Sequence, residues 1–184
     1  MNTLAICPGS FDPVTYGHLD IIRRAATMFD SVIVLVSYNA TKNGGTFLIP
    51  ERIDFLKRTT NDIPNVSIDS YDGLTAEYAI QKGAVAIVKG LRAVSDFEDE
   101  FQQALINKQL APDVETVFMV ASQEYMYLSS SAVRQVCYFG GDINMFMPES
   151  IVGDVKKKIL AAKTAREEKG AVGSARLDGE KLSL

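Results

Sequence analysis

The sequence predicts a protein of the α/β class, with an open doubly wound parallel sheet of five strands followed by C-terminal helices. Five short apolar runs rich in branched residues are spread along the chain, and segments with helical spacing of apolar residues separate them. Nearly continuous apolar strands that alternate with helices are typical of a parallel sheet with both faces covered. About 47% of the 184 residues are apolar, which is enough to bury the core of one domain.

The expected elements follow one another in chain order. Strands are predicted at residues 4–7, 32–36, 66–68, 85–88 and 114–120. A helix is predicted after each of the first three strands, because apolar residues recur there with helical spacing. These residues are Ile21, Ile22, Ala25 and Phe29 after the first strand, Ile53 and Leu56 after the second, and Leu74, Tyr78 and Ala79 after the third. Two helices are predicted after the fifth strand, over residues 131–139 and 149–163, with a break at Gly140 and Gly141.

The end of the chain differs in composition from the rest. From Thr164 onward it mixes charges with Gly, Ser and Ala and lacks apolar periodicity. We therefore expect residues 1–163 to form the folded domain and residues 164–184 to be a mobile tail.

Charge and composition exclude several classes of protein. The net charge of −4 argues against binding nucleic acid or a membrane surface through bulk positive charge, so any anion must be held by locally placed groups. One histidine, His18, and two cysteines, Cys7 and Cys137, are too few for the usual zinc sites. No secretory leader and no run long enough to span a bilayer stand out, so we expect a soluble, cytoplasmic protein.

Ligands of open parallel sheets bind beyond the carboxyl ends of the strands, where the strand order reverses. The loop over residues 8–18 follows the first strand, and there Gly9 and Ser10 offer bare backbone and a hydroxyl. Thr15 is a plausible helix N-cap, and Gly17 leaves the first helical amides open to a phosphate. His18 lies in the first turn, where a lone histidine is otherwise commonly structural.

Two known phosphate-binding loops are absent from the sequence. No Gly-x-Gly-x-x-Gly follows the first strand, and no Gly-x-x-x-x-Gly-Lys-Ser/Thr occurs. A dinucleotide-dependent dehydrogenase and a P-loop enzyme are therefore not supported.

The segment Thr15-Tyr16-Gly17-His18 resembles the T/H-x-G-H signature of the nucleotidyltransferase superfamily, whose members have a Rossmann-like sheet. Three further segments, at residues 8–13, 89–98 and 128–134, are similar to bacterial phosphopantetheine adenylyltransferases, and the resemblance extends over about residues 3–160. It implies a nucleotidyltransferase domain that transfers AMP from ATP to 4′-phosphopantetheine, giving dephospho-coenzyme A and pyrophosphate. It also implies Mg²⁺ on the ATP phosphates and a homohexamer.

The resemblance assigns roles to residues of this chain. The implied catalytic residues are His18, Lys42 and Arg92. The implied phosphopantetheine-binding residues are Ser10, Lys42, Thr75 and Lys89. The implied ATP-binding residues are Ser10, Phe11, His18, Gly90, Leu91, Arg92, Glu100, Tyr125, Met126, Tyr127, Leu128, Ser129, Ser130 and Ser131.

Several of these residues could instead have a purely structural or solvent-exposed role. Lys42 could be a solvated loop lysine, Arg92 a surface cation, and Glu100 part of the solvated face of a helix. A serine cap alone would explain part of the run Ser129-Ser130-Ser131.

Three positions depart from the family pattern. Ser10 stands where threonine is commoner, Lys89 where many members have arginine, and Tyr16 where asparagine is frequent. The ammonium of a lysine at position 89 is a compact charge, whereas the guanidinium of an arginine could donate two parallel hydrogen bonds to a phosphate. None of the three removes a group that the chemistry requires.

The chemistry fits a chain with one histidine, because the acceptor phosphate is already an anionic nucleophile. Such a reaction needs alignment of two polyanions and stabilisation of charge, rather than a serine nucleophile or a strong base. Two alternatives stay open. One is another enzyme of the superfamily, such as a nicotinamide-nucleotide adenylyltransferase or a cytidylyltransferase, and the other is a non-catalytic nucleotide-binding module.

Overall fold

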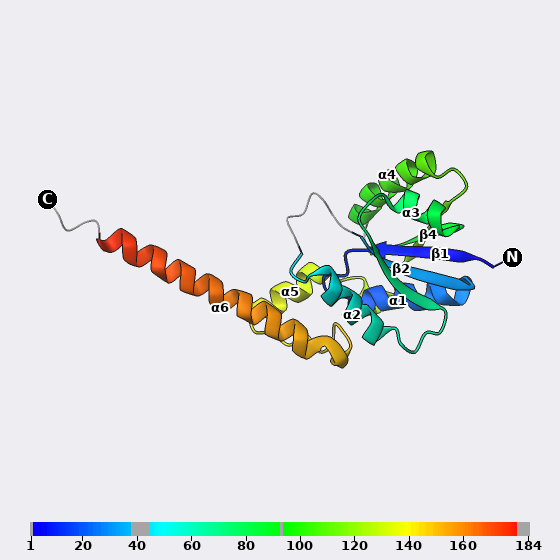
Figure 1. The fold of residues 1–184 in the computed structure, drawn as a ribbon. Helices are drawn as coiled ribbons and strands as arrows, with labels where there is room; N and C mark the ends of the chain where they lie inside the picture. Colours follow the sequence, from blue (N-terminus) through cyan, green and yellow to red (C-terminus); the bar gives the residue numbers. More distant parts are fainter. Residues whose placement is uncertain (1, 38–44, 93, 180–184) are drawn as a thin grey trace.

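Five parallel strands form one central sheet in the computed structural model of the chain (Figure 1). The structure describes residues 2–37, 45–92 and 94–179, without the side chains of residues 94–96 and 169–179. The strands are β1 (Leu4–Gly9), β2 (Ser31–Ser37), β3 (Val66–Tyr71), β4 (Ala86–Leu91) and β5 (Glu115–Val120), and their order is β3-β2-β1-β4-β5. Every strand pair is parallel, so the predicted fold class is confirmed.

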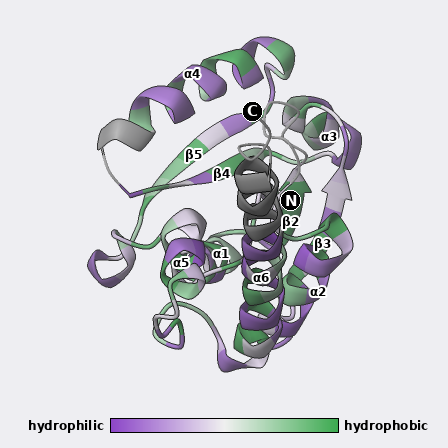
Figure 2. Ribbon diagram, turned by 90° about the vertical axis from the view of Figure 1, so that its left-hand side faces the viewer, coloured by the Kyte–Doolittle hydropathy of each residue, from purple (hydrophilic) through white to green (hydrophobic). Residues whose placement is uncertain are grey.

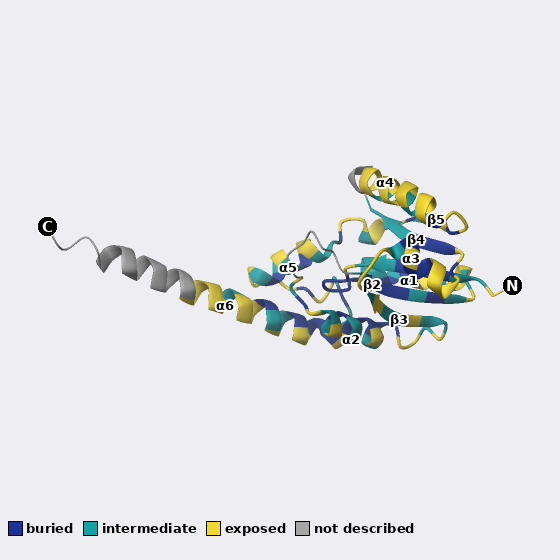
Figure 3. Cartoon of the chain, turned by 45° about the horizontal axis from the view of Figure 1, so that its top comes forward, coloured by how far each residue is buried: buried dark blue, intermediate teal, exposed yellow. Residues whose placement is uncertain are grey.

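Helices connect the strands and cover the sheet. They are α1 (Tyr16–Met28), α2 (Ile49–Thr59), α3 (Thr75–Lys82), α4 (Val94–Leu110), α5 (Ser130–Tyr138) and α6 (Glu149–Gly179), with a 3-10 turn η1 (Gln123–Tyr125). The sequence pattern did not predict the bounds of α4. Its apolar residues Phe97, Phe101 and Leu105 recur every four positions, but their side chains are exposed in the single chain. Figure 3 shows this helix as mainly exposed.

Helix α6 is longer than the sequence predicted. The expected end was at residue 163, but the helix continues to Gly179, and its second half extends away from the sheet (Figure 1). Residues 160–169 consist mainly of Ala, Arg, Glu, Lys and Leu, which are good helix formers, so this part can remain helical without an apolar face. Beyond it, Gly170 and Gly173 are poor helix formers, but no proline interrupts the helix. The mobility of residues 164–184 stays a prediction. Along the described part of the chain, no helix is both long enough and apolar enough to cross a membrane.

Each face of the sheet has its own core, because successive strand side chains point to opposite faces. One core joins Val32 and Val34 of β2 to residues of α1, α2, α5 and α6. The other joins Ile6, Leu35 and Ile87 to α3 and to the segment that follows α4. Figure 2 shows apolar strands between helices that carry mixed apolar and polar residues.

The strand order reverses between β1 and β4. From β1 the chain builds β2 and β3 on one side, and β4 and β5 lie on the other. The carboxyl ends of β1 and β4, near Gly9 and Leu91, are therefore the edge at which a ligand is expected.

Candidate active site

A pocket of about 480 Å³ opens at the carboxyl ends of β1 and β4. Its walls come from the loop between β1 and α1, the end of β4, helix α4 and the start of α5. Eleven of the residues assigned by resemblance line it, namely Ser10, Phe11, His18, Lys89, Gly90, Arg92, Glu100, Leu128, Ser129, Ser130 and Ser131. Residues far apart in the sequence thus meet where the strand order reverses.

The loop after β1 folds back on itself at Phe11. Phe11 has a positive φ of 46°, and its ring is only 3% exposed. A Cβ atom at Gly9 would lie 2.9 Å from Cζ of that ring, so a glycine at this position leaves room for it. The ring also meets the His18 imidazole edge-on, with 5.2 Å between the ring centroids. Gly9 and Phe11 therefore set the position of the imidazole.

His18 is held by the residue that caps its own helix. The backbone N–H of Thr15, the N-cap of α1, donates to Nδ1 of His18 at 3.1 Å, and Oγ1 of Thr15 lies 2.9 Å from the same nitrogen. Because Nδ1 accepts this bond, the neutral imidazole carries its proton on Nε2. Burial lowers the pKa of His18 to about 4, and the charge of Arg92 contributes. At neutral pH the ring is therefore an uncharged donor.

We expect this low pKa to be measurable directly, because the chain has one histidine and therefore one set of imidazole signals. In an NMR titration of the unliganded protein, the midpoint should lie near 4, below the ordinary value of 6.5. Replacing Arg92 by glutamine should raise the midpoint, because that change removes a positive charge that disfavours the imidazolium. A midpoint at or above 6.5 in the wild-type protein would contradict the burial of the ring.

Arg92 and the three serines organise the opposite wall. Nη1 of Arg92 donates to the carbonyl oxygen of Leu128 at 2.9 Å, which ties the end of β4 to the segment before α5. Ser129 is the N-cap of α5, and its Oγ accepts the N–H of Ala132 at 3.1 Å. Ser130 instead donates to the carbonyl oxygen of Pro13 at 2.7 Å. Capping therefore accounts for one hydroxyl, and a second one joins α5 to the loop after β1.

Lys89 and Glu100 contact each other across the pocket. Nζ of Lys89 lies 2.8 Å from Oε2 of Glu100, and both side chains are partly buried. The resemblance assigns Lys89 to the acceptor and Glu100 to the nucleotide. The two charges neutralise one another, so an anion that binds Lys89 competes with this carboxylate.

Several assigned residues lie elsewhere. Thr75, Leu91, Tyr125, Met126 and Tyr127 do not line this pocket, and Lys42 falls outside the described residues. Thr75 begins α3, Leu91 ends β4, and Tyr127 is largely exposed.

The unusual Tyr16 acquires an explanation here. Its ring stacks on that of Tyr125, with 6.2 Å between centroids and 27° between planes. A Cβ atom at Gly17 would lie only 3.6 Å from Cβ of Tyr125, so η1 packs closely on the start of α1. Tyr16 therefore fixes η1 against the start of α1, outside the lining of the pocket.

Sequence reasoning assigned no role to three further residues at this site. Arg134 lines the pocket, and its Nη1 donates to the carbonyl oxygen of Asp12. Asp12 in turn forms an ion pair with Arg52 of α2. Asp12 and Arg134 belong to the segments at residues 8–13 and 128–134, which could have drawn attention to them. Arg52 has no such signal, because its contacts depend on how α2 packs.

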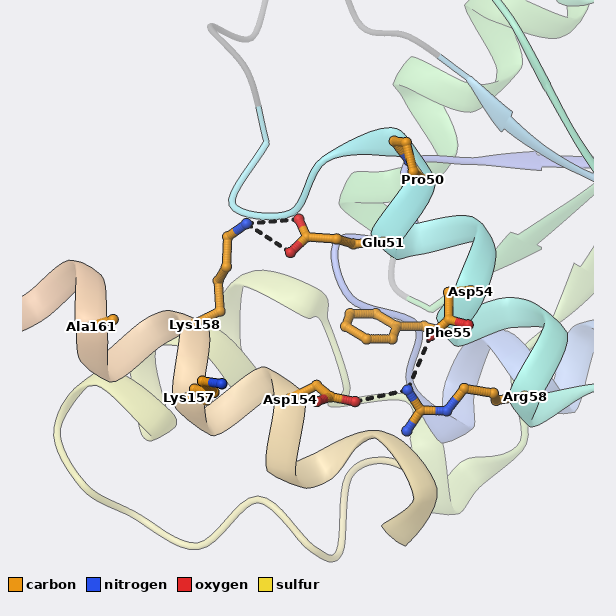
Figure 4. Close-up of a pocket in the computed structure, with 9 residues that line it drawn as sticks. All are labelled: Pro50, Glu51, Asp54, Phe55, Arg58, Asp154, Lys157, Lys158 and Ala161. Carbon is orange, nitrogen blue, oxygen red and sulfur yellow. Dashed lines mark hydrogen bonds and ion pairs between the residues drawn. The ribbon is translucent and has the colours of Figure 1, made fainter.

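A larger groove of about 700 Å³ lies between α2 and α6 (Figure 4). Its charges neutralise one another: Lys158 binds Glu51 at 2.7 Å, and Arg58 lies 3.0 Å from Asp54 and 2.7 Å from Asp154. Lys158 also holds the pKa of Glu51 below its usual range through this hydrogen bond. Lys157 is the third cation of the groove, so three cations face three carboxylates, and a groove with balanced charges suits helix packing better than binding of a polyanion. The pocket at β1 and β4 is therefore the candidate active site.

The chain matches the Cytidylyltransferase-like family model over residues 6–136. It is 54% identical over 155 residues to a phosphopantetheine adenylyltransferase of Caldanaerobacter subterraneus subsp. tengcongensis, which covers 84% of this chain and 96% of the relative. A phosphopantetheine adenylyltransferase of Clostridium tetani is 49% identical with the same coverage.

Solved structures agree on the fold. A putative nicotinate-nucleotide adenylyltransferase from Vibrio parahaemolyticus superposes with a TM-score of 0.63 at 19% identity, covering 91% of this chain and 97% of its own. A bifunctional NMN adenylyltransferase/ADP ribose pyrophosphatase from Francisella tularensis gives a TM-score of 0.64 at 16% identity, covering 100% of this chain and 57% of its own.

Proposed function

This chain belongs to the phosphopantetheine adenylyltransferase family, and on that premise we propose that it transfers the adenylyl group of ATP to 4′-phosphopantetheine. The products are dephospho-coenzyme A and pyrophosphate. The observation that carries the proposal is the 54% identity over 96% of a relative's length. The pocket at the carboxyl ends of β1 and β4 is where this chemistry would take place.

The reaction is a direct in-line displacement. An oxygen of the acceptor phosphate forms a bond to the α-phosphorus of ATP, and the bond from that phosphorus to the bridging oxygen of pyrophosphate breaks. The electron pair leaves with pyrophosphate, so no proton has to be removed from the nucleophile. Catalysis then rests on alignment and on stabilisation of charge in the transition state.

The residues of the pocket supply these two effects. The neutral imidazole of His18 donates from Nε2 to an oxygen of the α-phosphate as negative charge builds up there. Arg92 provides a fixed positive charge beside the nucleotide, and the amides at the starts of α1 and α5 favour phosphate oxygens. Lys42 and Lys89 serve the acceptor phosphate in this proposal.

We propose that Mg²⁺ acts on the ATP phosphates. Over the residues that the structure describes, no group of three or more carboxylate, thiol or imidazole side chains is placed to hold a metal ion. The donor set that fits Mg²⁺ is therefore that of the nucleotide phosphates and water. When bound there, the ion neutralises charge on the departing pyrophosphate.

The experiment that tests the function is an assay of pyrophosphate release with matched substrates. ATP or CTP is combined with phosphopantetheine, nicotinamide mononucleotide or glycerol phosphate. We expect rapid release only with ATP and phosphopantetheine. Preference for another pair would identify a different nucleotidyltransferase, and ATP binding without acceptor-dependent release would identify a non-catalytic module.

We also propose that the chain forms an oligomer, a hexamer by its family resemblance. Helix α4 exposes a stripe of apolar side chains that a second copy could cover, namely Phe97, Phe101, Leu105, Ile106 and Leu110. The mass of the protein in solution tests this proposal.

The cytoplasm is the proposed location. Cys7 and Cys137 are free thiols and are buried, which suits a reducing compartment. Fractionation of cells that express the chain tests it.

A further inference from the structure

A buried carboxylate lies directly behind the wall of the pocket. Asp12 is 7% exposed, although it belongs to the loop between β1 and α1. Its Oδ2 accepts the backbone N–H of Thr46 at 2.9 Å, and its Oδ1 accepts that of Phe47 at 2.8 Å. The carboxylate thus fastens the segment before α2 to the loop that carries Ser10 and His18.

Arg52 of α2 contacts the same two segments. It is 6% exposed, and its Nε lies 3.3 Å from Oδ1 of Asp12. Nε also donates to the carbonyl oxygen of Phe47 at 2.7 Å, and Nη1 donates to that of Ser10 at 3.1 Å. One guanidinium therefore joins the segment before α2 to the residue at the pocket wall.

The space around this ion pair is tightly filled. A Cβ atom at Gly45 would lie 1.6 Å from Nη2 of Arg52 and 2.9 Å from Cγ of Asp12. The backbone at Gly45 is therefore packed against both charged groups, and no larger residue fits without moving them.

The other end of the connection between β2 and α2 reaches the same loop. Oγ of Ser37, the last residue of β2, donates to the carbonyl oxygen of Gly9 at 3.3 Å. Both described ends of this connection are thus attached to the stretch from Gly9 to Asp12.

Stability alone is a weak reason to keep such a pair. Desolvation of two charges offsets much of their attraction, and apolar residues of similar volume often stabilise a core as well. What the pair does provide is geometry, because five contacts set the position of the segment before α2 against the loop after β1.

We propose that Asp12 and Arg52 are positioning residues for the acceptor. They hold Ser10 and residues 45–47 in the arrangement that receives phosphopantetheine, without touching the reacting atoms. The proposal rests on the proposed function. It assigns the pair to the acceptor because both side chains hold the connection between β2 and α2, which contains Lys42, the lysine that the resemblance assigns to the acceptor. Helix α5 is attached to the same loop chiefly through backbone oxygens, since Ser130 donates to the carbonyl oxygen of Pro13 and Arg134 to that of Asp12.

The test measures steady-state kinetics of the full chain while each substrate is varied in turn. In Asp12→Asn and Arg52→Lys we expect KM for phosphopantetheine to rise about 10- to 100-fold, since small misplacements of binding groups have effects of that size. KM for ATP should change by less than about threefold, because the bond from Arg92 to Leu128 and the bond from Arg134 to the backbone carbonyl of Asp12 are both retained. Gly45→Ala should act in the same direction without removing a charge.

Arg58→Lys is the matched control. Arg58 lies on the same helix and is also ion-paired, in its case with Asp54 and Asp154, but it faces the groove between α2 and α6. Neither KM should change in this variant. Urea unfolding of every variant separates loss of the fold from loss of positioning.

An equal rise of both KM values would overturn the proposal, and so would an unchanged KM for phosphopantetheine in folded variants. If Asp12→Asn does not fold, the KM values of Arg52→Lys and Gly45→Ala test the proposal in its place. Hydrogen exchange at the amides of Thr46 and Phe47 gives a readout that does not depend on activity, and it should accelerate in Asp12→Asn. A wild-type chain without phosphopantetheine turnover would refute the proposed function, whereas unchanged exchange would refute the role of Asp12.

Discussion

Replacing His18 by alanine is expected to lower kcat by about two to three orders of magnitude, the size of effect seen when one preorganised donor to a developing charge is removed. The affinity for ATP should change far less, because in the proposed mechanism Arg92 and the start of α5 also bind the nucleotide and are unaltered by this substitution. In the proposed mechanism, the neutral Nε2–H donor strengthens its bond to the α-phosphate only as negative charge develops there during the reaction. Single-turnover kinetics and calorimetric titration with ATP measure the two quantities separately.

His18→Asn is the matched control for this experiment, because His18 also serves the N-cap. An asparagine oxygen can accept the N–H of Thr15 in place of Nδ1 and should restore stability that the alanine variant loses. It should not restore turnover to the wild-type level. Near-normal kcat in His18→Ala would remove His18 from the proposed transition-state contacts.

Replacing Phe47 by alanine is expected to destabilise the fold by about 3–5 kcal/mol, as is usual for removing a buried aromatic ring. Phe47 is 1% exposed, and its ring packs edge-on against Phe55 with 5.3 Å between centroids. Its N–H and carbonyl are bound to Asp12 and Arg52, so the backbone cannot move in to fill the cavity. Urea unfolding measures the loss.

The neighbouring Leu48→Ala provides the comparison. Leu48 is 66% exposed, and its backbone N–H is bound to Glu51, a bond that the substitution keeps. Its effect should stay within about 0.5 kcal/mol. A loss below about 1 kcal/mol in Phe47→Ala would mean that the segment before α2 repacks freely.

The strands and most helices could be predicted because their apolar residues are buried on known periods. In β2, for example, Val32, Val34 and Leu35 are all buried, and the branched run is visible in the sequence. Helix α4 was harder to delimit because its apolar stripe is not covered within the chain, so its pattern did not distinguish it from a surface segment. The extension of α6 beyond residue 163 depends on helix propensity rather than on burial.

Some residues of the candidate site could likewise be predicted from the sequence, and others could not. Ser10 and His18 could be assigned because they follow a strand within one short motif. The ion pair of Arg52 with Asp12 could not, because it joins residues 40 positions apart that only the packing of α2 brings together. The contact of Lys89 with Glu100 likewise depends on where α4 crosses the end of β4.

The reversal of strand order between β1 and β4 has a consequence for protein engineering. The loop after β1 lies at this reversal and is bound on both sides: the carboxylate of Asp12 accepts the N–H of Thr46 before α2, and its carbonyl oxygen accepts Nη1 of Arg134 on α5. A library that searches for new phosphorylated acceptors should therefore leave Asp12, Phe47 and Arg52 unchanged and vary the residues that line the pocket. The fold thus separates the residues that can be redesigned from those that hold the loop in place.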